Sequence, residues 1–98
     1  MGLDQSLYAT SKDPKDIGEL QPEEELVGWR KNYGIHEWMF DRFRQVLNGM
    51  PTRLTADDLD GLEAYLRLLG DDRGEWDAIR RARLALGRGL NVFYCAIW

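Results

Sequence analysis

The stretch "LTADDLDGLEAYLRLLG", residues 54–70, carries the clearest structural signal in the chain. Thr55 is a favoured helix N-cap residue, and Asp58 stands three positions later, where the carboxylate of a capping box lies. Leu54 and Leu59 have the spacing of a hydrophobic staple, and Gly70 can end the helix. The leucines expected on its buried stripe are Leu59, Leu62, Leu66 and Leu69.

A longer helix is predicted upstream, over residues 24–47, because apolar side chains recur there with a helical period. Asn48 or Gly49 is expected to take the left-handed cap at its end. The residues placed on its inward arc are Leu26, Trp29, Tyr33, His36, Phe40, Phe43 and Leu47. Arg30 and Trp38 fall on the polar side of this predicted helix.

A third helix is predicted downstream, with Asp71 or Asp72 at its cap and with Gly87 and Gly89 at its end. Its inward residues are expected to be Trp76, Ile79, Ala82 and Leu86.

Strands are predicted at both ends of the chain. "GLDQSLYA", residues 2–9, reads as a short strand, and "LNVFYCAIW", residues 90–98, is apolar and rich in β-branched and aromatic residues. The charged segment between residues 10 and 25 is rich in turn formers and predicts a loop. The order strand, loop, three helices, strand predicts one α+β domain over residues 1–98, with about three helices packed on a small sheet formed by the N- and C-terminal strands.

The composition favours a folded, intracellular protein. The 98 residues are 44% hydrophobic and 31% charged, unlike a disordered chain. The one cysteine, Cys95, cannot form an intrachain disulfide, which favours a reducing compartment. There is no apolar run long enough to span a membrane and no secretory signal, so we expect a cytoplasmic protein without membrane partners.

The net charge of −4 is distributed in blocks. Residues 57–77 carry eight acids against two arginines, whereas residues 78–98 carry four arginines and no acid. Because a nucleic-acid binder needs a dominant basic face, direct nucleic-acid binding is not expected. The blocks fit either the preference of acids and bases for opposite helix ends or two opposed charged patches.

No pattern for catalysis, metals or cofactors emerges. The chain has no glycine-rich phosphate loop and no Cys/His pair spaced for zinc. Cys95 lies in an apolar run, where a thiol is usually inert. We therefore expect no enzyme activity, no metal and no cofactor.

The candidate binding residues concentrate in "VGWRKNYGIHEWMF", residues 27–40. His36 is either a core histidine with a backbone or carboxylate partner, or a histidine in a pocket walled by Trp29, Tyr33 and Phe40. Trp38 is either an exposed binding anchor near basic side chains or is covered by another element. Arg30 and Lys31 contact an anion or are simply solvated.

The acidic residues Asp57, Asp58 and Asp60 form a second candidate site. They serve as helix caps on a solvated face, or they mimic the charge of nucleic acid toward a basic partner.

The stretches "MGLDQSLYA" and "EELVGWRKNYGIHEWM" resemble a family of small uncharacterised bacteriophage and prophage proteins. Members begin Met-Gly-Leu-Asp and later carry Trp-Arg-Lys, Ile-His, one residue and Trp-Phe. The matching positions are Gly2, Leu3, Asp4, Leu7, Trp29, Arg30, Lys31, Ile35, His36 and Trp38. Met39 stands where the family has Phe, one residue is inserted near the N-terminus, and the similarity ends near residue 40. The resemblance implies a phage-encoded accessory protein made in the host bacterial cytoplasm.

Two functions are expected from these observations. The first is a non-enzymatic protein that binds and inhibits a host or anti-phage defence protein, using an acidic or nucleic-acid-mimicking face. The alternative is a small-molecule or nucleotide binder that sequesters its ligand in a pocket around His36. Either function is compatible with a homodimer.

Overall fold

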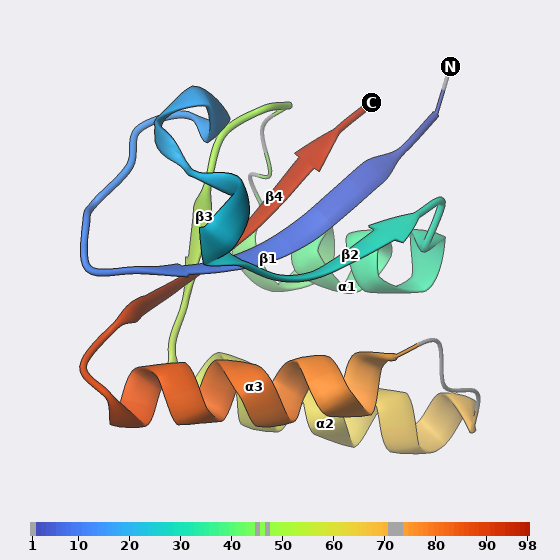
Figure 1. Cartoon of the computed structure of the whole chain (residues 1–98). Helices are drawn as coiled ribbons and strands as arrows, with labels where there is room; N and C mark the ends of the chain where they lie inside the picture. Colours follow the sequence, from blue (N-terminus) through green and yellow to red (C-terminus); the bar gives the residue numbers. More distant parts are fainter. Residues whose placement is uncertain (1, 45, 47, 71–73) are drawn as a thin grey trace.

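The structure, a computed structural model, describes residues 2–44, 46, 48–70 and 74–98. Within these residues, four strands form one antiparallel sheet in the order β2-β1-β4-β3, and three α-helices pack against it (Figure 1). The elements are β1 (Asp4–Thr10), β2 (Glu25–Arg30), α1 (Tyr33–Phe43), β3 (Thr52–Leu54), α2 (Ala56–Leu69), α3 (Glu75–Gly87) and β4 (Asn91–Ile97). The expected α+β class is confirmed.

The two terminal strands form the centre of the sheet. β1 and β4 pair antiparallel along their whole length, from Asp4 opposite Ile97 to Thr10 opposite Asn91. The predicted pairing of the N- and C-terminal strands is therefore confirmed. β2 and β3 extend the sheet on either side.

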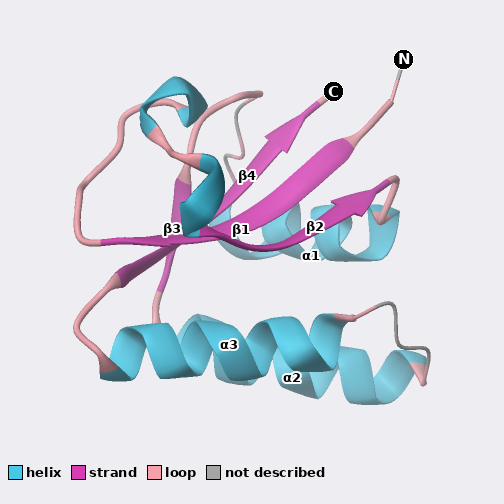
Figure 2. Ribbon diagram, in the orientation of Figure 1, coloured by secondary structure: helices cyan, strands magenta, loops and turns pink. Residues whose placement is uncertain are grey.

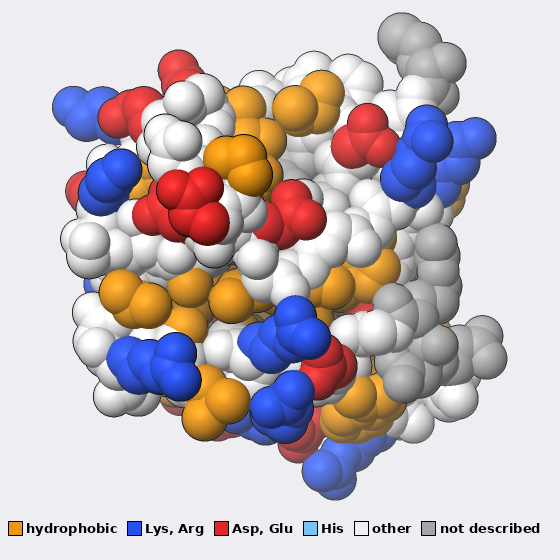
Figure 3. All heavy atoms as spheres, viewed as in Figure 1, with side chains coloured by type: hydrophobic (Ala, Val, Ile, Leu, Met, Phe, Trp, Pro, Cys, Tyr) orange, Lys and Arg blue, Asp and Glu red, His pale blue; other side chains and the backbone are white. Residues whose placement is uncertain are grey.

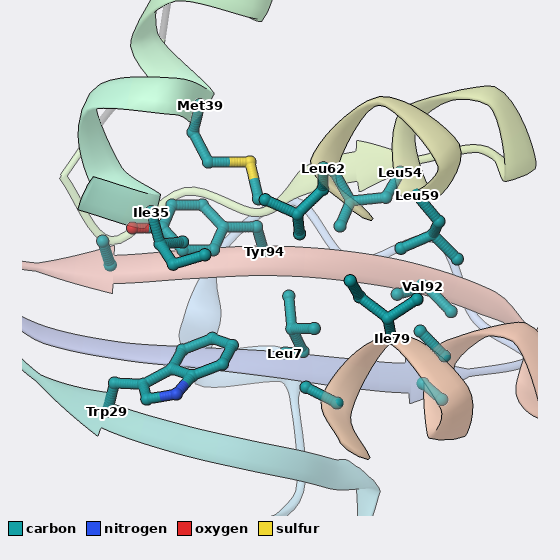
Figure 4. Packing of buried hydrophobic residues seen from close by; sticks show 14 of the residues in the cluster. Leu7, Trp29, Ile35, Met39, Leu54, Leu59, Leu62, Ile79, Val92 and Tyr94 are labelled. Atoms are coloured by element: carbon teal, nitrogen blue, oxygen red, sulfur yellow. The ribbon is translucent and has the colours of Figure 1, made fainter. Parts of the chain in front are cut away.

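The core lies between the sheet and the helices (Figure 4). Leu7 and Tyr94 stand opposite each other on β1 and β4, and both are fully buried. Leu62 from α2 and Ile79 from α3 cover the same face of the sheet. Among the described residues, every buried side-chain nitrogen or oxygen has a hydrogen-bond partner.

The other face of the sheet is covered by the segment between β1 and β2, which contains the short 3-10 helices η1 (Ile17–Glu19) and η2 (Pro22–Glu24) (Figure 2). The N–H of Ile17 donates to the carbonyl of Gly49, whose own N–H donates to the carbonyl of Ala96, at 3.0 and 2.8 Å. Phe93 and Cys95 are buried on this side.

The helix predicted after Thr55 is confirmed as α2, except that Leu69, which was expected on its buried stripe, is 50% exposed. The Thr55 side chain accepts from the N–H of Asp58, and the Asp58 carboxylate accepts from the N–H of Thr55, so the capping box is complete. Gly70 ends α2 in the left-handed conformation. In α3, Ile79 and Ala82 are buried as expected.

The start of the third helix differs in part from the prediction. The predicted caps Asp71 and Asp72 lie outside the described residues. The described helix has Gly74 at its N-cap and begins at Glu75.

The predicted helix over residues 24–47 is wrong in its first part and too long. Residues 25–30 form strand β2, and α1 ends at Phe43, where Arg44 takes the left-handed cap in place of Asn48 or Gly49. Val27 and Trp29 share one face of a strand, and Val27 pairs opposite Leu7 of β1. This long-range pairing outweighs a local pattern that also fits a helix.

Candidate functional site

The candidate site that contains His36 is a pocket where the two ends of the described chain meet α1. It has a volume of about 330 Å³ and is lined by Gly2, Leu3, Tyr33, His36, Phe40 and Trp98. We call it the His36 pocket. Its residues come from the start of the chain, one flank of α1 and the end of β4 (Figure 1).

The orientation of α1 places His36 in this pocket. Asn32 caps the helix, its side chain accepting a hydrogen bond from the N–H of Ile35. Ile35 and Met39, one turn apart, are the buried residues of α1. The inward arc is therefore rotated from the predicted one, and Tyr33 and Phe40 are 56% and 40% exposed.

Two aromatic rings lie against the open side of the imidazole. Both Phe40 and Trp98 meet His36 edge to face with ring centroids 5.0 Å apart, and Phe40 and Trp98 lie 6.3 Å from each other. The amide of Asn48 holds the backbone of Trp98 through two hydrogen bonds of 3.0 and 3.2 Å. The pocket walls are thus held by polar contacts outside the pocket.

Beneath the imidazole runs a buried chain of hydrogen bonds. The Tyr94 hydroxyl lies 2.8 Å from His36 Nδ1 and accepts from Gln5 Nε2 at 2.9 Å. The Gln5 amide in turn bonds the backbone of Asn32 twice, accepting from its N–H at 2.8 Å and donating to its carbonyl at 2.9 Å. We call His36, Tyr94, Gln5 and Asn32 the polar chain.

Backbone atoms determine the direction of each bond in the polar chain. Since a backbone N–H only donates and a carbonyl only accepts, Asn32 fixes which end of the Gln5 amide is nitrogen. That nitrogen donates to Tyr94, so the hydroxyl proton of Tyr94 is left to donate to His36 Nδ1. A neutral imidazole carries its one proton on the other nitrogen, so Nε2–H is the group that His36 offers in the pocket.

Burial keeps both ring partners uncharged. Desolvation lowers the pKa of His36 below its usual 6.5 and raises the pKa of Tyr94 to about 12. The pocket therefore presents a neutral histidine at neutral pH. The predicted pocket alternative for His36 agrees with this geometry, except that Trp29 does not line the cavity.

The other residues expected around His36 lie elsewhere. Trp29 is buried in β2, and Arg30 forms an ion pair with Asp4 at 3.1 Å. Lys31 is exposed in the turn before α1, with a positive φ of 56°. The guanidinium of Arg30 lies near the rim of the pocket, because a Cβ on Gly2 would be 3.5 Å from Arg30 Nη2.

Trp38 is covered by α2, the second of the two alternatives for this residue. It packs against the core, its ring lies under the Arg42 guanidinium at 5.5 Å, and a Cβ on Gly61 would approach it to 3.3 Å. Trp38 therefore joins α1 to α2.

The acidic residues of α2 are largely engaged within the fold. Asp58 is buried and bonded to Arg42. Burial pushes the pKa of Asp58 upward, but hydrogen bonds from Arg42 and Thr55 outweigh it, and the pKa is lowered. Asp60 pairs with Arg83 at 2.8 Å, and Asp57 stays exposed. This pairing weakens the case for a face that mimics nucleic acid.

A second hollow of about 430 Å³ runs between α3 and the segment that contains η2. Figure 3 shows apolar side chains along this seam, with basic and acidic side chains around it. Its arginines include Arg80 and Arg81, which both bond Asp77. Arg81 also donates to the carbonyl of Leu26. The bond from Arg81 to Leu26 joins α3 to β2, whereas the two pairs with Asp77 lie within α3.

Cys95 is not a candidate nucleophile. It is buried on the sheet face opposite the helices, and burial raises its thiol pKa to about 12. In the described part of the chain, no cluster of three or more metal-binding side chains exists. No helix in that part is long and apolar enough to cross a membrane.

The sequence reasoning missed the pocket residues Gly2, Leu3 and Trp98, and it missed Gln5, Asn32 and Tyr94 of the polar chain. Gln5 gave a signal, since it is a polar residue on the inward face of a strand between Leu3 and Leu7.

Comparison of the chain with protein-family models, with curated proteins and with solved structures found no match.

Proposed function

We propose that this chain is a binding protein that takes a small planar, largely apolar ligand into the His36 pocket. The observation that carries the proposal is the His36–Tyr94 hydrogen bond, which leaves an N–H donor among aromatic walls. Small-molecule sites are concave and mostly apolar, with a few placed polar groups, and start at volumes of about 300 Å³.

The proton positions support binding rather than general-base catalysis. A catalytic histidine base needs a free nitrogen lone pair toward the substrate, with its other nitrogen donating to a carboxylate or carbonyl. In the polar chain the two nitrogens of His36 have the opposite roles: Nδ1 accepts from Tyr94, and Nε2 carries the proton that faces the pocket. His36 can therefore hold a ligand but has no lone pair to offer it while neutral.

A second candidate is docking on a host or defence protein, which would suit the phage-encoded accessory protein that the resemblance implies. The exposure of Tyr33, Phe40 and Trp98 at the mouth of the pocket favours it, because clustered apolar side chains mark interaction sites. In this candidate an aromatic side chain of the partner enters the same pocket, so the apolar surface replaces the acidic face as the docking element.

The test is a titration of ¹⁵N-labelled protein with quinoline, followed by amide chemical shifts. We expect saturable shifts centred on the residues that line the pocket. Phe40→Ala should weaken binding about fivefold or more, whereas Leu84→Ala, which removes a similarly exposed side chain from α3, should not. Shifts that do not saturate, or that centre on α3, would overturn the proposal.

Phe40→Ala and Leu84→Ala also test the second candidate function, docking on a host protein. If a host protein is the natural ligand, its recovery from a bacterial lysate on immobilised protein should be lost with Phe40→Ala and retained with Leu84→Ala. Equal recovery by both variants would exclude the pocket as the docking site.

A further inference from the structure

We infer that the His36 pocket selects neutral aromatic ligands that carry a hydrogen-bond acceptor, and that Gln5, acting through Tyr94, is the residue that sets this preference. The inference rests on the proposed function. It adds the chemical class of the ligand and assigns a positioning role to two residues outside the pocket.

The first step is the fixed orientation of Gln5. Its side chain is 2% exposed and bonds both the N–H and the carbonyl of Asn32. Rotating the amide by 180° would place nitrogen against the N–H and oxygen against the carbonyl, so both bonds would be lost. Gln5 thus presents a donor to Tyr94 and no acceptor.

The second step is the hydroxyl of Tyr94, which is fully buried. Its described partners are Gln5 Nε2, which donates to it, and His36 Nδ1. If Nδ1 carried a proton, both neighbours would donate and the hydroxyl proton would have no described acceptor. Burial makes an unmade hydrogen bond costly, so Nδ1 stays unprotonated and Nε2 carries the proton.

The third step is the chemistry of the pocket lining. With Nε2 protonated, the His36 and Trp98 side chains are both pure donors, and Tyr33 adds a hydroxyl. The nearby charges of Arg30 and Asp4 form an ion pair, which leaves little net charge at the rim. A ring nitrogen or carbonyl on a neutral aromatic ligand can accept from both of these donors. A ligand with only an N–H to offer finds one acceptor among the lining side chains, the hydroxyl of Tyr33, whose side chain is 56% exposed and open to water.

The tautomer can be measured without any ligand. In wild-type protein labelled with ¹⁵N-histidine, at a pH where the ring is neutral, Nε2 should give the shift of a protonated nitrogen and Nδ1 that of an unprotonated one. Tyr94→Phe should give a mixture of tautomers, and Gln5→Leu should do the same if it folds. Tyr33→Phe, which changes a pocket hydroxyl outside the polar chain, should leave the tautomer unchanged. A proton on Nδ1 in wild type would overturn the inference.

Selectivity is measured with three bicyclic probes of similar size. Quinoline carries an acceptor nitrogen, indole a donor N–H and naphthalene neither. Wild type should bind quinoline about fivefold more tightly than naphthalene, with indole no better than naphthalene. In Tyr94→Phe the affinities for quinoline and indole should agree within about twofold, because either nitrogen of His36 can then carry the proton, whereas naphthalene, which forms no hydrogen bond, should stay weaker than both.

The tautomer and selectivity measurements can contradict different parts of the inference. Equal binding of quinoline and naphthalene by wild type with the expected tautomer overturns the ligand class but leaves the proposed function standing. Failure of all three probes to bind overturns both the ligand class and the proposed function. Unchanged tautomer and selectivity in Tyr94→Phe overturn the positioning role.

Discussion

The Tyr94 hydroxyl lies 2.8 Å from Nδ1 of His36, although the two residues are 58 positions apart in the sequence. This contact joins the central strand β4 to the helix that carries the pocket. Tyr94 therefore contributes both to packing, through its buried ring, and to the site, through its oxygen.

Removing only that oxygen should measure its contribution to stability. Tyr94→Phe removes the acceptor of one Gln5 Nε2 proton and the donor to His36 Nδ1, although Gln5 keeps both bonds to Asn32, so we expect the free energy of unfolding to fall by about 1–2 kcal/mol. The measurement is urea denaturation. Tyr33→Phe, at an exposed tyrosine, should change the free energy of unfolding by less than about 0.5 kcal/mol. Equal losses in both variants would contradict the polar chain.

Stability should fall in mild acid because of His36. Its pKa is lowered by burial in the folded state, so below about pH 6.5 the unfolded chain binds a proton that the folded chain does not. The stability that the neutral imidazole contributes is complete above pH 6.5 and is lost as the pH falls through the folded-state pKa. Urea denaturation at pH 5 and 7.5 should show a larger decrease for wild type than for His36→Gln. A larger decrease in the variant would reverse the predicted sign.

The orientation of α1 can be tested by two neighbouring substitutions. Met39 is fully buried, so Met39→Ala should cost roughly 2–4 kcal/mol of unfolding free energy. Phe40 is 40% exposed at the pocket, and Phe40→Ala should cost less than about 1 kcal/mol. Thermal or urea unfolding gives both values, and the opposite order would favour the arc predicted from sequence.

The capping box of α2 should be a major local contribution to stability. Asp58→Ala removes the cap of Thr55 and leaves Arg42 without its carboxylate, so we expect a loss of about 1–3 kcal/mol. Asp57→Ala, one residue earlier and exposed, should cost no more than about 0.5 kcal/mol. The melting temperatures of the two variants provide the comparison, and similar values would argue against the box.

The amide of Asn48 should matter for binding more than for folding. Asn48→Ala frees the backbone of Trp98, so a ligand has to order that wall when it binds. We expect the affinity for quinoline to fall about two- to fivefold, measured by the same titration. Asn91→Ala, which removes another asparagine that bonds a backbone carbonyl, should leave the affinity for quinoline unchanged. A loss in both variants would indicate a general effect on the fold.

The elements predicted well from the sequence are those whose signals are local. Helix α2 was predicted to the residue because Thr55, Asp58 and Gly70 act on their immediate neighbours. Strand β2 was missed because Leu26 and Trp29, three residues apart, fit the helical period that continues to Tyr33 and His36, although Val27 and Trp29 also fit a strand. Only pairing with β1, about twenty residues away, distinguishes the two.

The residues of the candidate site show the same contrast between local signals and long-range contacts. His36 was identified from its place in a run of aromatic residues, and the pocket alternative named Tyr33 and Phe40 as walls. Gln5 and Tyr94 could not be assigned to it, because the polar chain is assembled from β1, β4 and the turn before α1. Nothing in the local pattern of any one of these segments indicates the other two.

The pairing of Asp4 with Ile97 has a consequence for how the chain folds. On the ribosome, β1 emerges well before its central neighbour β4, so the middle of the sheet cannot form until residues 11–90 between them have been made. Contacts this distant in sequence slow folding, because the long loop between the two strands must close before they form. The first strand therefore waits with an open edge, and this interval is when the chain is most exposed to misassociation.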